Sequence, residues 1–136
     1  MNVDEVMAQI LKTEPATSLM PVREEWLAAV DEKYPGMPET LRRLYSRFGY
    51  GSIGESRYMI HCLLEPSEIY DPVTAKGLSG ILIVGDDFAG NCEAYDAANS
   101  WRFGSIGGSG EFEPYGHVYS SFIAFLEEWF VDVNDE

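Results

Sequence analysis

The chain has 136 residues and a mass of 15.2 kDa, and 46% of its residues are hydrophobic, which is typical of a folded domain and excludes a disordered segment. Nine Lys and Arg against 23 Asp and Glu give a net charge of −14, which repels nucleic-acid phosphates and anionic membranes and argues against both as partners. The same charge attracts a basic protein partner. We therefore expect one domain over residues 1–136.

The acidic surplus lies in the second part of the chain. Residues 1–50 carry eight acids and six bases, for a net charge of −2, and residues 51–136 carry 15 acids and three bases, for −12. The longest apolar run is too short to cross a membrane, and the N-terminus lacks the pattern of a signal peptide. Cys62 and Cys92 alone cannot form a disulfide framework. These features predict a cytoplasmic protein with reduced thiols.

The first half of the chain predicts three helices, over residues 3–11, 21–33 and 38–48. In each, apolar residues recur at the spacing of one helical face. Residues 13–18 are interpreted as a linker between the first two helices. Gly49 ends the third helix, because glycine readily adopts the left-handed conformation that follows many helices.

After residue 54 the apolar pattern changes to that of strands, with a turn or short helical bend at residues 66–69. The run at 81–84 is almost entirely apolar, which predicts a strand in the centre of its sheet. Turn-forming residues separate the predicted strands. The strands are expected at residues 58–64, 81–84, 91–96 and 101–106.

The end of the chain predicts one closing helix, capped by Ser120 or Ser121. Phe122, Leu126 and Trp129 fall on one stripe of this helix, which we expect to be buried against the sheet. Helices first, then closely spaced strands, then one helix is an α+β pattern. The predicted fold is therefore N-terminal helices, an antiparallel meander of about four to six strands, and a C-terminal helix packed on the sheet.

Three carboxylates beside a predicted hairpin suggest a metal site. Asp86, Asp87 and Asp96, joined by His61 or His117, would offer oxygen and nitrogen ligands to a divalent metal. However, the Asp-Asp-x-x-Gly-Asn run is equally a hairpin turn, and no calcium loop or His-Glu-x-x-His motif is present. The turn is the preferred interpretation, and a metal-dependent hydrolase is the less favoured alternative. We therefore expect no catalytic residue, metal or cofactor.

Loop aromatics next to acids are typical of a surface that binds a protein. We expect such a surface on the sheet and loops of the acidic part of the chain, with Phe88 and Tyr115 as anchors. The candidate contacts are Asp86, Asp87, Phe88, Glu93, Asp96, Glu111, Glu113 and Tyr115.

Three segments in order resemble a known family. In residues 37–51 a Met-Pro pair opens a helix that ends in turn glycines. Residues 81–96 read as a strand, a glycine-bearing turn and a second strand ending in Tyr-Asp, and residues 118–126 contain Ser-Phe-x-x-Phe-Leu. Together they resemble the SUKH superfamily, the fold of many bacterial toxin-immunity proteins and of the yeast Smi/Knr-type cell-wall regulators.

The resemblance implies a protein that works by binding, commonly by blocking a cognate toxin that is often a nuclease. Met37 replaces the usual leucine and Phe48-Gly-Tyr-Gly51 the usual Asn-Gly-Gly, changes that keep the apolar contact and the turn glycines. The matching residues form the scaffold and identify no partner contact: Pro38, Leu41, Tyr45, Gly85, Gly90, Tyr95 and Phe122. The resemblance and the acidic charge together predict a cytoplasmic immunity protein that fills the basic groove of a nuclease toxin. A regulatory interaction scaffold of the same fold is the alternative.

Overall fold

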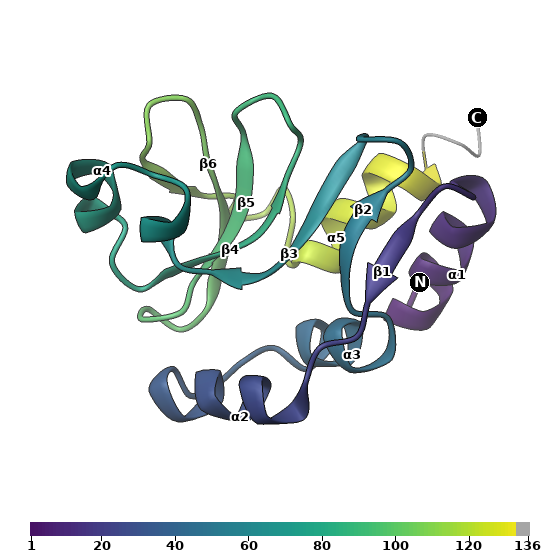
Figure 1. Cartoon of the computed structure of the whole chain (residues 1–136), viewed down its shortest axis with the longest axis horizontal. Coiled ribbons are helices and arrows are strands. Elements are labelled where there is room, and N and C mark those ends of the chain that lie inside the picture. Colours follow the sequence, from purple (N-terminus) through teal and green to yellow (C-terminus); the bar gives the residue numbers. More distant parts are fainter. Residues whose placement is uncertain (133–136) are drawn as a thin grey trace.

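The computed structural model describes residues 1–132 and has an α+β fold built on one antiparallel sheet of seven strands (Figure 1). Each strand pairs with the next along the chain, so the sheet is a meander. The strands are β1 (Ser18–Met20), β2 (Tyr50–Ile53), β3 (Tyr58–Leu64), β4 (Ile81–Asp86), β5 (Cys92–Asp96), β6 (Arg102–Ile106) and β7 (Phe112–Pro114).

Helices flank this sheet: they precede β1, lie between β1 and β2 and between β3 and β4, and follow β7. The side chain of Asn2 accepts a hydrogen bond from the N–H of Glu5, and Glu5 bonds back to the N–H of Asn2, so a capping box starts the first helix. Among residues 1–132, no helix has the length and apolar composition that crossing a bilayer requires. The helices are α1 (Val3–Thr13), α2 (Glu24–Lys33), α3 (Glu39–Arg47), the 3-10 turn η1 (Pro66–Glu68), α4 (Pro72–Gly77), α5 (Phe122–Leu126) and the π-helical segment η2 (Glu127–Asp132).

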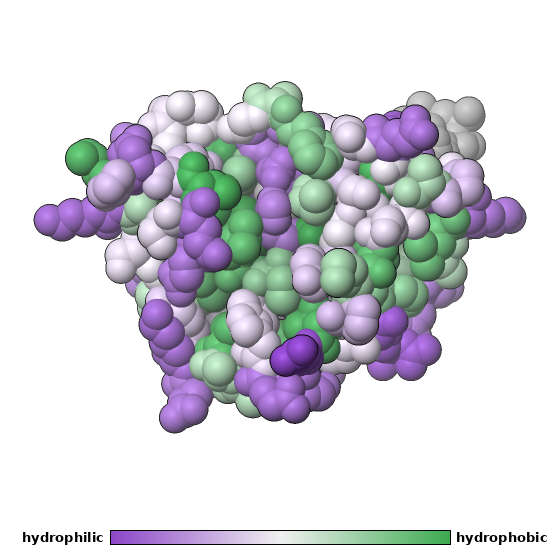
Figure 2. Space-filling model, viewed as in Figure 1, coloured by the Kyte–Doolittle hydropathy of each residue, from purple (hydrophilic) through white to green (hydrophobic). Residues whose placement is uncertain are grey.

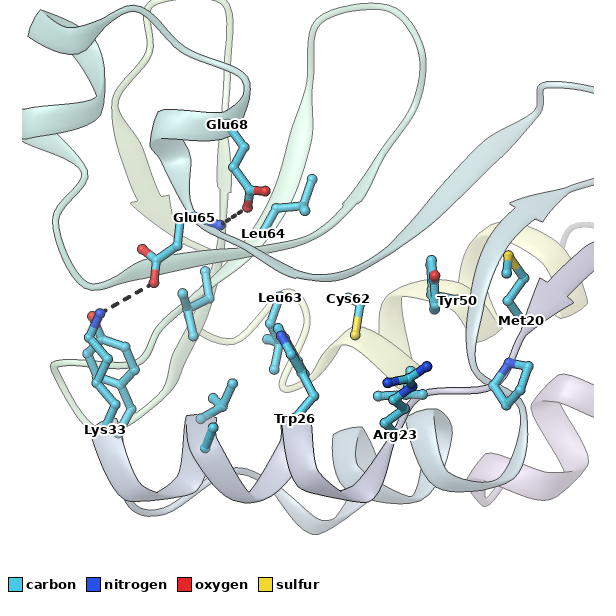
Figure 3. Close-up of a pocket in the computed structure, with 16 residues that line it drawn as sticks. Met20, Arg23, Trp26, Lys33, Tyr50, Cys62, Leu63, Leu64, Glu65 and Glu68 are labelled. Carbon is cyan, nitrogen blue, oxygen red and sulfur yellow. Dashed lines mark hydrogen bonds and ion pairs between the residues drawn. The ribbon is translucent and has the colours of Figure 1, made fainter.

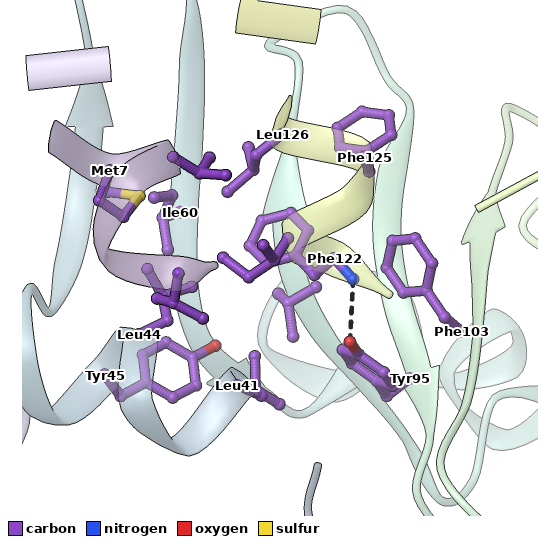
Figure 4. Close-up of a cluster of buried hydrophobic side chains, with 14 of the residues drawn as sticks. Met7, Leu41, Leu44, Tyr45, Ile60, Tyr95, Phe103, Phe122, Phe125 and Leu126 are labelled. Atoms are coloured by element: carbon purple, nitrogen blue, oxygen red, sulfur yellow. Dashed lines mark hydrogen bonds between the residues drawn. The ribbon is translucent and has the colours of Figure 1, made fainter. Parts of the chain in front are cut away.

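The larger core lies between one face of the sheet and helices α1, α3 and α5 (Figure 4). Leu82 and Val84 of β4 point into it and Phe122 of α5 is fully buried there. The hydroxyl of Tyr95 on β5 accepts a hydrogen bond of 2.9 Å from the backbone N–H of Phe122. This bond fixes the start of α5 over the sheet. The C-terminal helix therefore packs on the sheet, as the sequence predicted.

The opposite face of the sheet carries a second, smaller core. Ile81 and Ile83 alternate with the residues that face the larger core and instead contact Leu78 and Ile106. The side chains of β4 are almost all apolar because both faces of the strand are covered. The strand is the fourth of the seven in the sheet. The prediction of a central strand at residues 81–84 is confirmed.

The sheet has more strands than the four to six expected, since β1, β2 and β7 have no clear strand pattern, and α4 was also missed. A short strand is stabilised by its pairing more than by its own residues. Gly49 leaves room for β1 to pair with β2. Its φ is +99°, and a Cβ at this position would lie 1.9 Å from the carbonyl oxygen of Met20. The segment interpreted as a linker therefore leads into a strand. The second helix, expected from Pro21, begins at Glu24.

Trp129 corrects the predicted stripe of the closing helix. Phe122 and Leu126 are buried as expected, but Trp129 is 46% exposed. From Glu127 the helix widens into η2, whose π-helical turn takes more residues than an α-helical turn. The wider turn brings Phe130 into the core in place of Trp129.

Candidate functional site

The meander places alternate turns of the sheet at the same end. Asp86 pairs with Cys92, Cys92 with Ile106, and Ile106 with Phe112, so the β4–β5 and β6–β7 turns leave the sheet side by side. The β2–β3 turn emerges at this end as well (Figure 1). We call this region the acidic end, defined by Glu55, Asp86, Asp87, Phe88, Glu111 and Glu113. The topology thus brings five of the eight predicted contact residues together.

The β4–β5 turn is held by its own carboxylates. Asp87 Oδ1 accepts the backbone N–H groups of Ala89 at 2.8 Å and Asn91 at 3.2 Å, and Asp87 Oδ2 accepts the amide of Asn91 at 3.1 Å. Partial burial opposes the charge, but these hydrogen bonds outweigh it, so the pKa of Asp87 is lowered. The interpretation of the Asp-Asp-x-x-Gly-Asn run as a hairpin turn is confirmed.

The same turn presents Phe88 to solvent. Its side chain is 50% exposed, and its φ of +63° is unusual for a residue other than glycine. Asp86 supports this conformation, because its Oδ1 accepts the N–H of Phe88 at 2.8 Å while its Oδ2 is hydrogen-bonded to His61 Nε2 on β3. In Figure 2 the hydrophobic tip of the turn stands above a band of hydrophilic residues.

Glu93 does not belong to this exposed surface. Its side chain is only 4% exposed and accepts hydrogen bonds from the hydroxyls of Tyr58 and Tyr115. Burial raises the pKa of Glu93 to about 7. Tyr115 donates at 3.1 Å and packs its ring on Phe103, so it holds the segment after β7 to the sheet. Glu93 is therefore buried and not on the exposed surface where the contact was expected, and Tyr115 is half-buried.

Asp96 is also absent from the acidic end. It pairs with Ile81 at the other end of the β4–β5 hairpin and is 3% exposed. Its carboxylate accepts hydrogen bonds from Arg102 Nη2 at 2.7 Å and from the amide of Asn99 at 3.1 Å. These bonds stabilise the β5–β6 turn, so Asp96 has a structural role and is not a surface contact.

The register also separates the residues of the metal-site alternative. Asp86 and Asp96 lie at opposite ends of the hairpin, and Asp87 is directed into its own turn. His61 bonds to Asp86, while His117 is exposed in the segment before α5. Within the described part of the chain, no three His, Cys, Asp or Glu residues are placed to hold a metal ion. The geometry gives the hydrolase alternative no support.

Gly85 makes room for the buried hydroxyl that reaches Glu93. A Cβ at Gly85 would lie 2.1 Å from Tyr58 Oη, which is far inside van der Waals contact. We expect Gly85→Ala to lower the free energy of unfolding by about 1–3 kcal/mol through overpacking, as measured by chemical denaturation. Gly107→Ala is the matched control, because a Cβ there meets no atom within 4 Å. Equal stability of the two variants would contradict this close contact.

Glu55 is a part of the acidic end that the sequence does not single out. Glu55 is exposed in the β2–β3 turn, which becomes recognisable only once β2 is known to be a strand. The available signal was the Gly-Glu-Ser-Arg run at residues 54–57, a turn composition between two short strands.

The acidic end has the chemistry of a binding surface: exposed carboxylates, an exposed aromatic ring and a turn fixed by hydrogen bonds. Such a surface complements a basic partner with an apolar pocket. Searches of family models, curated proteins and solved structures found no match to this chain.

Proposed function

We propose that this protein is a SUKH-type immunity protein that binds a basic, nuclease-type toxin domain through its acidic end. The observation that carries the proposal is that exposed carboxylates and the half-exposed Phe88 lie on turns at the same end of one sheet. The acidic charge and the family resemblance support it. Binding, without catalysis by this chain, would block the toxin.

The charge distribution supports a basic target. Among the residues of the acidic end, Glu55, Glu111 and Glu113 are exposed and form no ion pair with the described residues. A nuclease needs a basic groove for its phosphate substrate, and these carboxylates would meet that groove where phosphates bind. Phe88 would supply the central apolar contact that most stable interfaces have.

The direct experiment uses the toxin gene expected next to the gene for this chain. Co-expression with this protein should restore growth of cells that produce the toxin domain, and the purified protein should inhibit its nuclease activity. An unrelated acidic protein of similar size is the control. A neighbourhood without any toxin gene, or a toxin that remains active at saturating protein, would reject immunity and favour the regulatory scaffold.

The role of the acidic end can be tested with charge-neutral variants. Glu111→Gln/Glu113→Gln should slow association with the toxin domain several-fold at low salt, and the difference should shrink at high salt because exposed charges are screened. Stopped-flow or surface-plasmon-resonance association rates at two ionic strengths measure this.

The matched control is Glu24→Gln/Glu25→Gln, which removes two exposed carboxylates from α2. Asp86 and Asp87 are left intact because they hold the β4–β5 turn. If Glu24→Gln/Glu25→Gln slows association as much as Glu111→Gln/Glu113→Gln, the effect comes from net charge and the acidic end is not the interface.

A further inference from the structure

A second feature lies away from the acidic end, between α2 and the sheet. Only Leu27 of α2 is buried, so most of the helix stands off the strands and leaves a groove of about 690 Å³ (Figure 3). This volume lies within the range of small-molecule sites. Trp26 and Val30 line the groove on the side of α2, and Leu63 and Leu82 line it on the side of the sheet. Trp26 is 38% exposed, so an apolar ligand would cover it.

The two ends of the groove differ in charge. At the C-terminal end of α2, Lys33 Nζ lies 3.6 Å from Glu65 Oε1 and 5.4 Å from the centre of the Tyr34 ring. Glu68 lies at the same end and accepts the backbone N–H of Glu65 at 3.1 Å. The charged side chains at this end therefore already have partners.

Arg23 stands at the other end and differs from these residues. Figure 3 shows its guanidinium rising from the start of α2 toward β3, with Tyr50 above it. Of the four charged residues that line the groove, Arg23 alone has no ion pair or side-chain hydrogen bond with any residue in the range 1–132. Its neighbour Cys62 is uncharged, because burial raises the pKa of that thiol to about 12. The groove thus offers one free cation at the end of an apolar channel.

We propose that this groove binds a small amphipathic carboxylate, with its carboxylate on Arg23 and its apolar tail between Trp26 and Leu63. A guanidinium binds a carboxylate through two parallel hydrogen bonds, and Tyr50 also lines the groove at this end. Glu65 and Glu68 repel a carboxylate from the opposite end, which sets the orientation. The site is separate from the acidic end and does not depend on the proposed immunity function.

Titration calorimetry with decanoate, decanol and decylammonium tests both the carboxylate contact with Arg23 and the apolar contact with Trp26 and Leu63. Decanoate should bind at least about tenfold more tightly than decanol, because even one hydrogen bond between charged groups contributes that much, and decylammonium should bind most weakly. Arg23→Gln should reduce the affinity for decanoate about tenfold and leave that for decanol unchanged. Lys12→Gln is the matched control, because Lys12 is also exposed and without an ion pair among residues 1–132 but lies on α1, outside the groove.

Alkylation of Cys62 by N-ethylmaleimide, followed by peptide mass spectrometry, locates the ligand. Decanoate should slow labelling of this half-buried thiol, and decylammonium should not at the same concentration. Binding of decanoate without protection of Cys62, equal affinity for decanoate and decanol, or equal effects of the Arg23 and Lys12 variants would overturn the proposal. Tighter binding of an apolar peptide with a free C-terminal carboxylate would also overturn it, in favour of a protein segment as the occupant.

Discussion

Phe122→Ala is expected to lower the free energy of unfolding by about 3–5 kcal/mol, the usual cost of deleting a buried aromatic ring. The ring is fully buried and has its centre 6.1 to 6.2 Å from the rings of Phe103, Tyr58 and Phe125. Because a domain of this size is stable by only about 5–15 kcal/mol, the variant should melt far below the wild type. Chemical and thermal denaturation measure the change.

Trp129→Ala is the matched control, since it removes an aromatic side chain from the same end of the chain. Trp129 is 46% exposed and its ring lies 5.2 Å from that of Phe125, so its loss should cost about 1 kcal/mol. If Phe122→Ala retained wild-type stability, or if the two variants lost equal stability, α5 would not pack on the sheet as described.

The second large effect is a loss of stability between pH 4.5 and about 7 caused by Glu93. The pKa of Glu93 rises from its ordinary 4.5 to about 7 on folding, so the folded chain binds this proton more tightly than the unfolded chain. The stabilisation is complete below pH 4.5 and is lost as the pH rises through 7. At 1.36 kcal/mol per pH unit, the loss is about 3 kcal/mol. Urea denaturation across this pH range measures it.

Glu93→Gln isolates this contribution from the general repulsion of an acidic protein, because it keeps the shape of the side chain and cannot ionise. Between pH 4.5 and 7, the free energy of unfolding of this variant should fall by about 3 kcal/mol less than that of the wild type. Glu113→Gln, at an exposed position, should keep the wild-type pH profile. If the Glu93→Gln profile also matched that of the wild type, the Glu93 carboxyl would not be buried as the structure places it.

Several parts of the structure follow from local sequence, because short-range physics decides them. The apolar spacing of α3, Ser121 as the cap of α5 and the uninterrupted apolar run of β4 all predict the observed elements. The Asp-Asp-x-x-Gly-Asn run likewise predicts the β4–β5 turn, since its hydrogen bonds join residues at most four apart. The sequence alone thus determined the α+β class, the central strand and the tip that carries Phe88.

Only the tertiary structure decided which acids are available to a partner. Glu93 and Asp87 are both carboxylates near the same hairpin, yet one is buried under Tyr58 and Tyr115 and the other remains half-exposed in the turn. Strand register and packing set that difference, and both depend on residues far away in the chain. The same holds for β1, whose pairing requires Gly49, and for the groove beneath β3, which exists because α2 buries a single side chain. Local pattern fixes the strongly periodic elements, whereas long-range pairing fixes the short strands and the face that each side chain meets.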